Sequence, residues 1–245
     1  MKKWGLIGHP LTHTFSPDYF KKKFQLLGIS DTYEVLDTPS LDHIKAEVSL
    51  RGWNGFNVTI PYKESILPLL DEITPLAQSI GAVNAVLVKK DKWIGTNTDV
   101  IGFEKSILPF LENQFPRALI IGTGGASKAV HFVLQDKGIE TYFLTRNPRL
   151  PQHLAYSQID AESLRHFPLI IQTTPLGTFP DVTAFPLIPY EGIQPSHLLV
   201  DLIYNPAETQ FLLEGKRRGA KTQNGLRMLE IQADAAWEFW NQPHP

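Results

Sequence analysis

Three short strings in the first hundred residues carry groups that can move a proton or hold a charged intermediate. NVTIPYK at Asn57–Lys63 puts a lysine just past an expected strand, NTD at Asn97–Asp99 follows another strand and opens a helix, and GAVN at Gly81–Asn84 starts a strand. An amine and a carboxylate can act as general acid and base, or stabilise charge that develops on an oxygen. Alone, Lys63 fits a surface lysine and Asp99 a helix cap. Together, the strings place polar groups at neighbouring strand ends, where open α/β sheets build their sites.

A glycine-rich string in the second half has the position of a dinucleotide-binding loop. GTGGAS at Gly122–Ser127 lies between the apolar run Ala118–Ile121 and an amphipathic helix. Glycines allow a tight turn there and let the N–H groups at the helix start meet a pyrophosphate. The third fingerprint position holds Ser127 instead of glycine or alanine, so a simple turn is the competing interpretation.

The end of the next strand indicates which dinucleotide would bind. The residues TRNPR at Thr145–Arg149 contain no acid, which an NAD site would use on the ribose 2′-hydroxyl, and they contain two arginines. Guanidinium groups suit a phosphate in charge and in bidentate geometry. The alternative interpretation is a solvated basic loop that binds no ligand. Of the two interpretations we favour a site for NADP(H).

The surrounding pattern predicts an α/β chain in which short apolar strands alternate with helices. Ser16, Ser40 and Thr74 are expected to begin helices as caps. The tail from Leu226 carries an apolar stripe that should dock against another element, and the strand–glycine loop–helix unit indicates a second domain beginning near residue 100. Strands are expected at 4–8, 32–36, 55–60, 84–88, 93–96, 118–121, 141–144, 169–172 and 198–202.

The composition excludes several classes of protein. The chain has 245 residues and a formal net charge of −2, so it shows no basic excess that would indicate nucleic-acid binding. It has no cysteine, which excludes disulfides and thiolate chemistry, and its eight histidines have no metal-binding spacing. No apolar run approaches the ~20 residues of a membrane span. We expect a cytoplasmic protein with no metal, no membrane and no nucleic-acid partner.

The chain resembles the shikimate dehydrogenase family nearly end to end. Besides the strings above, the resemblance rests on GHP at 8–10 with TFSP at 14–17, Asp201 with the YNP string at 204–206 and Thr209, and NGL at 224–226 followed by Gln232. It implies reversible NADPH-dependent reduction of 3-dehydroshikimate to shikimate, a step of aromatic amino-acid biosynthesis, by a monomer or homodimer.

The resemblance also implies a role for each matching residue. Lys63 and Asp99 would be the catalytic pair. The hydroxyls of Thr14, Ser16 and Tyr204 would hold the substrate carboxylate, and Thr59, Asn84 and Gln232 the ring hydroxyls. Cofactor contacts would come from Gly122, Gly124, Gly125, Ala126, Ser127, Thr145, Arg146, Thr174 and Gly225. The implied fold is a substrate-binding α/β domain at 1–99, completed by the C-terminal helix 226–245, and a doubly wound, Rossmann-like NADP-binding domain at 100–225.

Some positions depart from the family pattern, and other functions stay open. Thr14 stands where serine is usual, TRN at 145–147 replaces the order Asn-Arg-Thr, and QTT at 172–174 replaces a string that contains asparagine. A quinate/shikimate dehydrogenase with relaxed cofactor use is the nearest alternative. A non-catalytic sensor is a second alternative, and it should have lost Lys63, Asp99 or a substrate hydroxyl. A third is a related two-domain fold such as methylenetetrahydrofolate dehydrogenase, which shares the nucleotide-binding half but not the hydroxyl clamp together with Asn57–Lys63. The sequence does not decide which member of the Lys63–Asp99 pair moves the proton.

Overall fold

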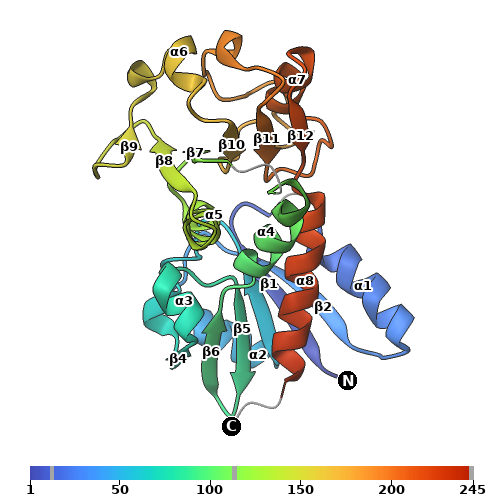
Figure 1. The fold of residues 1–245 in the computed structure, drawn as a ribbon. Helices are drawn as coiled ribbons and strands as arrows, with labels where there is room; N and C mark the ends of the chain where they lie inside the picture. Colours follow the sequence, from blue (N-terminus) through green and yellow to red (C-terminus); the bar gives the residue numbers. More distant parts are fainter. Residues whose placement is uncertain (12–13, 112–114, 243–245) are drawn as a thin grey trace. The chain divides into compact units, whose positions relative to one another are not determined.

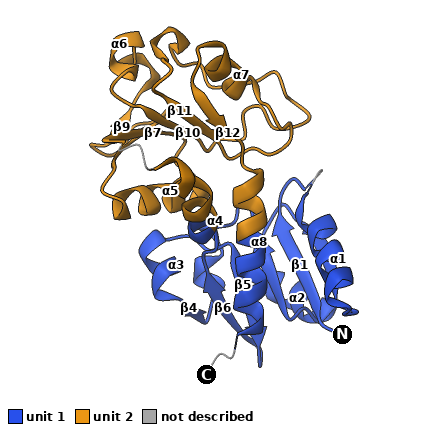
Figure 2. Ribbon diagram, turned by 45° about the vertical axis from the view of Figure 1, so that its right-hand side comes forward, with its two compact units in different colours: residues 1–101, 232–245 blue, residues 102–231 orange. Residues whose placement is uncertain are grey.

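The computed structural model describes residues 1–11, 14–111 and 115–242. The chain forms two compact units, Met1–Ile101 with Gln232–Pro245, and Gly102–Ile231. Figure 1 follows the elements along the chain, and Figure 2 colours the two units separately.

The first unit is built on a mixed sheet with the strand order β2-β1-β3-β5-β6-β4. Strand β5 is antiparallel to both of its neighbours, β3 and β6, so these two run in the same direction and end at the same edge of the sheet. The strands are β1 (Lys3–Gly8), β2 (Thr32–Asp37), β3 (Gly55–Val58), β4 (Glu72–Ile73), β5 (Ala85–Lys89) and β6 (Lys92–Thr96). The edge at which β3 and β6 end and β5 begins therefore collects the segments that carry Lys63, Asp99 and Asn84.

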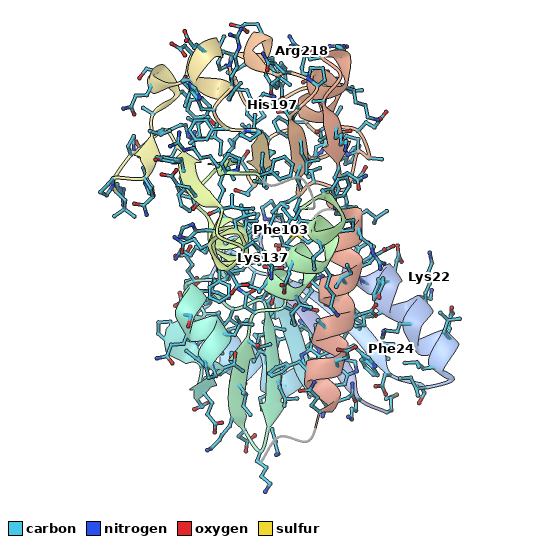
Figure 3. The ribbon with its side chains drawn as sticks, viewed as in Figure 1. Lys22, Phe24, Phe103, Lys137, His197 and Arg218 are labelled. Atoms are coloured by element: carbon cyan, nitrogen blue, oxygen red, sulfur yellow. The ribbon has the colours of Figure 1, made fainter. Side chains whose placement is uncertain are left out.

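Two apolar clusters cover this sheet. In one, α2 (Ile44–Arg51) and α3 (Pro75–Ile80) pack with the aromatic rings of Trp53, Phe56 and Trp93. In the other, α1 (Ser16–Leu27) and the part of α8 (Leu226–Asn241) from Gln232 onward pack with Trp4 and Leu87. Helix α1 is amphipathic, because Phe24 is part of the buried cluster and Lys22 is exposed. Figure 3 labels both side chains on this helix.

The expected docking of the apolar tail is confirmed. The ring of Trp240 stacks on Trp4 with centroids 4.7 Å apart, and its Nε1 donates to the carbonyl oxygen of Val86 at 3.0 Å. Ala233 and Ala236, one turn apart on the same face of α8, are fully buried. The part of α8 from Gln232 onward is thereby an integral part of the first unit's core. Residues 243–245 of the expected segment 226–245 lie outside the described residues.

The second unit contains a wholly parallel sheet with the order β12-β11-β10-β7-β8-β9. Its strands are β7 (Arg117–Ile121), β8 (Glu140–Leu144), β9 (His153–Leu154), β10 (Leu169–Gln172), β11 (Leu198–Asp201) and β12 (Lys221–Gln223). The chain starts at β7, moves outward to β9, and returns to β10 on the other side of β7. This doubly wound, Rossmann-like order confirms the expected fold class, and it puts a topological switch point between β7 and β10.

The α-helices of the second unit are α5 (Gly125–Asp136), α6 (Ala161–Leu164) and α7 (Gln210–Arg217), with the part of α4 (Asp99–Ile107) from Gly102 onward and the part of α8 up to Ile231. Buried apolar residues on α5, such as Val130 and Leu134, match the helical face expected after the glycine loop. Phe211 and Leu212 of α7 belong to the main core cluster of this unit.

Three expected helix starts are wrong in detail. Ser16 is the first residue of α1 and does not cap it, and Asp99 is likewise the first residue of α4. Helix α2 begins at Ile44 rather than after Ser40, because His43 adopts the left-handed conformation (φ 60°) just before the helix. Thr74, in contrast, caps α3 as expected by accepting a hydrogen bond from the N–H of Ala77.

Within the three described ranges, no helix combines the length and the apolar character needed to cross a membrane. Nor do the described His, Cys, Asp and Glu residues gather in groups of three or more that could hold a metal ion.

Candidate active site

Lys63 and Asp99 form an ion pair at the sheet edge where β3 and β6 end. The Nζ atom of Lys63 lies 2.6 Å from Oδ2 of Asp99, and the two side chains are 15% and 6% exposed. A charge-assisted hydrogen bond with so little access to water is stronger than a surface ion pair. The arrangement puts an ammonium group and a carboxylate, thirty-six positions apart in the sequence, in direct contact.

Backbone contacts explain how these two side chains come together. The carbonyl oxygen of Lys63 accepts from the N–H of Val83 at 2.7 Å, which ties the segment after β3 to the segment before β5. Asn97 bridges in the same region, because its Nδ2 donates to Ala82 and its Oδ1 accepts from the N–H of Val100. Asn97 thus satisfies an N–H of the first turn of α4, and the Asp99 carboxylate is available for Lys63.

Asn84 and Gln232 join the ion pair in one hydrogen-bonded cluster. Asn84 Nδ2 lies 2.9 Å from Asp99 Oδ1, the carboxylate oxygen that Lys63 does not contact. The same nitrogen lies 3.3 Å from Gln232 Oε1, and Thr98 contacts both amides. All five side chains belong to the first unit. Four of the site residues expected from the sequence are therefore brought together, and Thr98, to which no role was given, lies among them.

Three further expected substrate residues lie on neighbouring segments of the first unit. Thr59 directly follows β3, and its N–H donates to Ile7 of the adjacent β1. Thr14 is partly buried in the segment between β1 and α1, and Ser16 is buried at the start of α1. The Ser16 side chain is hydrogen-bonded to the phenol of Tyr33, whose pKa is raised by burial. Their contact with a substrate stays a prediction.

The glycine loop of the second unit has the geometry expected at a switch point. Gly122 follows β7 with a φ of 107°, and a Cβ atom there would lie 2.8 Å from both Thr173 and Thr174, which follow β10. Gly124 precedes α5, and a Cβ atom there would meet no heavy atom of the described residues within 4 Å. Gly122 therefore needs its glycine for the protein's own packing, whereas the space at Gly124 is open to a ligand.

Ala126 and Ser127 lie in the first turn of α5. The hydroxyl of Ser127 donates to the carbonyl oxygen of Gly124 at 2.6 Å. Serine at this fingerprint position thus makes a hydrogen bond that glycine or alanine could not make. Gly125 is the first residue of the helix.

The segment after β8 presents exposed cationic side chains. Arg146 and Arg149 are exposed, and Thr145 Oγ1 accepts from the N–H of Asn147 at 3.3 Å. Tyr156 lies near Arg146, whose charge lowers the pKa of this phenol, although burial raises it more. The segment offers guanidinium groups at the position where a dinucleotide fold meets the ribose.

The remaining expected residues lie after β10, β11 and β12. The N–H and the hydroxyl of Thr174 both donate to Oε1 of Gln172, at 3.1 and 3.0 Å. Tyr204 is half-buried with a raised pKa, again because of burial. The N–H of Gly225 donates to Ile203, and a Cβ atom on Gly225 would lie 2.0 Å from the carbonyl oxygen of Leu202.

Asp201 is a buried carboxylate in the same region to which the sequence assigned no role of its own. Its Oδ2 accepts from the hydroxyl of Thr209 at 2.6 Å, and its Oδ1 accepts from the N–H of Ile203 at 3.0 Å. The two contacts hold both ends of the loop that carries Tyr204. Burial raises the pKa of Asp201 to about 7, although both hydrogen bonds lower it. The sequence feature that could have indicated this role is its position three residues before Tyr204.

Comparison with known proteins agrees with this geometry. Residues 6–86 match the family model described as the shikimate dehydrogenase substrate binding domain. A shikimate dehydrogenase (NADP(+)) from Staphylococcus aureus is 39% identical over 97% of this chain and 92% of its own length.

Solved structures show the same likeness across both units. Shikimate dehydrogenase 1 from Peptoclostridium difficile aligns with a TM-score of 0.87 and 36% identity, covering 100% of this chain and 93% of that one. The shikimate 5-dehydrogenase of Thermus thermophilus, solved in complex with NADP(H) and shikimate, aligns with a TM-score of 0.86 and 35% identity over 100% of this chain and 95% of that one. The chain therefore belongs to the shikimate dehydrogenase family of oxidoreductases.

Proposed function

We propose that this chain catalyses the reversible reduction of 3-dehydroshikimate to shikimate with NADPH, and that Lys63 and Asp99 are its catalytic pair. The observation that carries this proposal is the contact of 2.6 Å between Lys63 Nζ and Asp99 Oδ2, with Asn84 on the other carboxylate oxygen. Burying an ammonium group and a carboxylate costs free energy, so an inactive relative would be expected to have lost this pair.

The reaction requires a proton at an oxygen as well as a hydride at a carbon. When bound, the reduced nicotinamide supplies the hydride. The Lys63–Asp99 pair would take the proton from the shikimate hydroxyl in one direction and return it to the ketone oxygen in the other. Because the two groups share one hydrogen bond, either one can face the reacting oxygen while the other holds it in place. When Asp99 moves the proton, the Lys63 ammonium stabilises the charge that develops on that oxygen. When Lys63 moves the proton, its neutral amine takes it from the hydroxyl and its ammonium returns it to the ketone oxygen.

Substrate binding is assigned to the hydroxyl and amide groups around this pair. Asn84 and Gln232 already contact Asp99 or each other, which supports their assignment to the ring hydroxyls together with Thr59. Thr14, Ser16 and Tyr204 are assigned to the carboxylate, because hydroxyl groups can donate to a carboxylate without adding charge. The substrate domain would comprise residues 1–99 and 226–245.

The residues of the second unit fit NADP(H). The open space at Gly124 lies at the start of α5, a twelve-residue helix whose first N–H groups and dipole favour a pyrophosphate. Arg146, with Thr145 beside it, is assigned to the 2′-phosphate, and Thr174 and Gly225 to the nicotinamide end. The cofactor-binding residues would lie within 100–225 and include Gly122, Gly125, Ala126 and Ser127.

The proposed reaction uses a small acid and a soluble dinucleotide, which supports a cytoplasmic location. We infer a monomer or a homodimer, which sedimentation of the purified protein would distinguish.

The central experiment mixes purified protein with shikimate and NADP⁺ and follows the absorbance of reduced nicotinamide. We expect turnover by the wild-type protein and at least a hundredfold lower kcat for Lys63→Met. Turnover that survives this substitution would remove Lys63 from the mechanism, and inactive wild-type protein would end the proposal.

The alternative, a quinate/shikimate dehydrogenase with relaxed cofactor use, is tested in the same assay. Shikimate and quinate are each combined with NADP⁺ and NAD⁺. The absence of an acid after β8 and the presence of Arg146 favour shikimate with NADP⁺ as the combination with the highest kcat/KM.

A further inference from the structure

The site contains two amide side chains, Asn84 and Gln232, and each can be oriented with its oxygen or its nitrogen toward a given neighbour. The oxygen and nitrogen ends of an amide have nearly the same shape but opposite hydrogen-bonding character. A site that must donate to substrate oxygens works only if each nitrogen end faces the correct way. The neighbours of these amides therefore decide what the site can bind.

Thr98 fixes the orientation of Asn84. The backbone N–H of Thr98 lies 2.6 Å from Asn84 Oδ1, and a backbone N–H can only donate. The oxygen end of Asn84 must therefore face Thr98, and the nitrogen end faces the Asp99 carboxylate at 2.9 Å. In the reversed orientation, the amide oxygen of Asn84 would oppose a carboxylate oxygen, and the Thr98 N–H would oppose an NH₂ group.

The same residue contributes to the orientation of Gln232. Gln232 Oε1 lies 3.3 Å from Asn84 Nδ2 and 3.4 Å from Thr98 Oγ1. The hydroxyl of Thr98 accepts from Asn84 Nδ2 at 3.0 Å, and Asn84 Oδ1 already accepts from the Thr98 N–H at 2.6 Å. We therefore assign the hydroxyl proton of Thr98 to Gln232 Oε1, which fixes the oxygen end of Gln232 toward Thr98. The nitrogen end of Gln232 is then the end that can donate to a substrate oxygen.

We propose that the Thr98 hydroxyl is a positioning group that sets the donor–acceptor polarity of Gln232, so that this amide directs an N–H group toward an oxygen of the substrate ring. Thr98 is 1% exposed, and its hydroxyl acts through Gln232. This inference rests on the proposed function, because it assigns Gln232 to a substrate hydroxyl. It makes shikimate affinity, and not cofactor affinity, the property that the Thr98 hydroxyl controls.

The test is steady-state kinetics of Thr98→Val, which keeps the backbone N–H and the side-chain shape but removes the hydroxyl. We expect KM for shikimate to rise about three- to tenfold, as for the loss of one hydrogen bond. The KM for NADP⁺ and kcat should stay within about twofold of the wild type. Thr96→Val is the matched control, because the Thr96 side chain is also buried but is bonded to Thr74 instead of an amide.

Further variants separate positioning from general damage. Thr98→Ser should restore the KM for shikimate, because it returns the hydroxyl. In a Gln232→Ala background, Thr98→Val should raise this KM by a smaller factor than in the wild type. If Thr98→Val does not fold, Thr98→Ala gives the same comparison. Equal KM values for the Thr98 and Thr96 variants overturn the inference while the wild type remains active, whereas inactive wild-type protein overturns the proposed function itself.

Discussion

Asn84 donates to the one carboxylate oxygen of Asp99 that Lys63 leaves uncontacted. Lys63 Nζ lies 2.6 Å from Oδ2, and Asn84 Nδ2 lies 2.9 Å from Oδ1. With both oxygens engaged, the plane of the carboxylate is fixed, and the direction from which Lys63 approaches it is fixed too. A group held in this way loses little further freedom when substrate binds, which is the condition for efficient proton transfer.

Removing the ammonium group should cost activity and stability by separate routes. In Lys63→Met, we expect kcat for shikimate oxidation to fall about 10²- to 10⁴-fold, because the pair loses one of its two proton-handling groups. The buried carboxylate keeps Asn84 but loses its cation, so the free energy of unfolding should fall by about 1–3 kcal/mol. Assays of turnover and urea unfolding measure the two effects.

The double variant Lys63→Met/Asp99→Asn is the control for this prediction. It removes the uncompensated charge, so part of the lost stability should return while activity stays low. A double variant as unstable as Lys63→Met would show that packing, and not charge, causes the loss.

Two glycines of the same loop should respond differently to alanine. At Gly124 the φ angle is −82° and the built Cβ meets open space, so Gly124→Ala should fold with nearly unchanged stability. Its methyl group would occupy the space assigned to the pyrophosphate, and we expect KM for NADP⁺ to rise at least about tenfold. At Gly122 the φ angle is 107° and Thr173 and Thr174 are 2.8 Å from the built Cβ.

Gly122→Ala should therefore lower the melting temperature, whatever it does to cofactor binding. Thermal melts without ligand, followed by NADP⁺ titrations, separate the two variants. The assignment of Gly124 fails if Gly124→Ala binds NADP⁺ like the wild type.

Arg146 should set the preference for NADP⁺ over NAD⁺. Arg146→Gln removes the cation but keeps a polar side chain, so kcat/KM for NADP⁺ should fall about 10- to 100-fold while that for NAD⁺ changes less than about twofold. Arg149→Gln is the matched comparison, because Arg149 is also exposed on the same loop. If the two substitutions reduce the NADP⁺ preference alike, the 2′-phosphate is shared between both guanidinium groups. If neither does, this loop does not bind it.

Much of the fold follows from local signals in the sequence. Pro75 and Gly81 bound α3 as expected, since Gly81 ends the helix with a φ of 70°. The polar turn between β5 and β6 is also as expected, and Lys90 and Asp91 adopt the positive φ angles of a tight hairpin. Buried runs such as Leu169–Gln172 appear as strands at the expected residues.

Other features depend on tertiary contacts that leave no local pattern. Strands β4 and β9 have two residues each, too few to show a period, and exist because they pair with β6 and β8. Asp99 has the sequence signature of a helix cap. In the structure, however, its carboxylate is hydrogen-bonded to Lys63 and Asn84. The role of Thr98 likewise depends on Gln232, which is 134 positions away in the sequence.

The buried carboxylate of Asp201 should make the stability of the protein depend on pH. Burial raises its pKa to about 7 in the folded state, above the ordinary value of 3.8 in the unfolded chain. The folded state thus binds this proton more tightly, so the associated stability is fully present below pH ~4 and is lost as the pH rises through about 7. Between pH 5 and pH 8 the loss should amount to about 2–3 kcal/mol. Asp201→Asn removes this ionisation while keeping an acceptor for the N–H of Ile203.

The measurement is urea unfolding of both proteins at several values between pH 5 and pH 8. The difference in unfolding free energy, wild type minus Asp201→Asn, should become steadily less favourable to the wild type as the pH rises. Because all other titrating groups are shared, their contributions cancel in this difference. A difference that stays constant over the range would mean that Asp201 keeps the same charge throughout. Thr209 and Ile203 would then hold an ionised carboxylate in the core, and the loop that carries Tyr204 would be anchored by charge rather than by a shared proton.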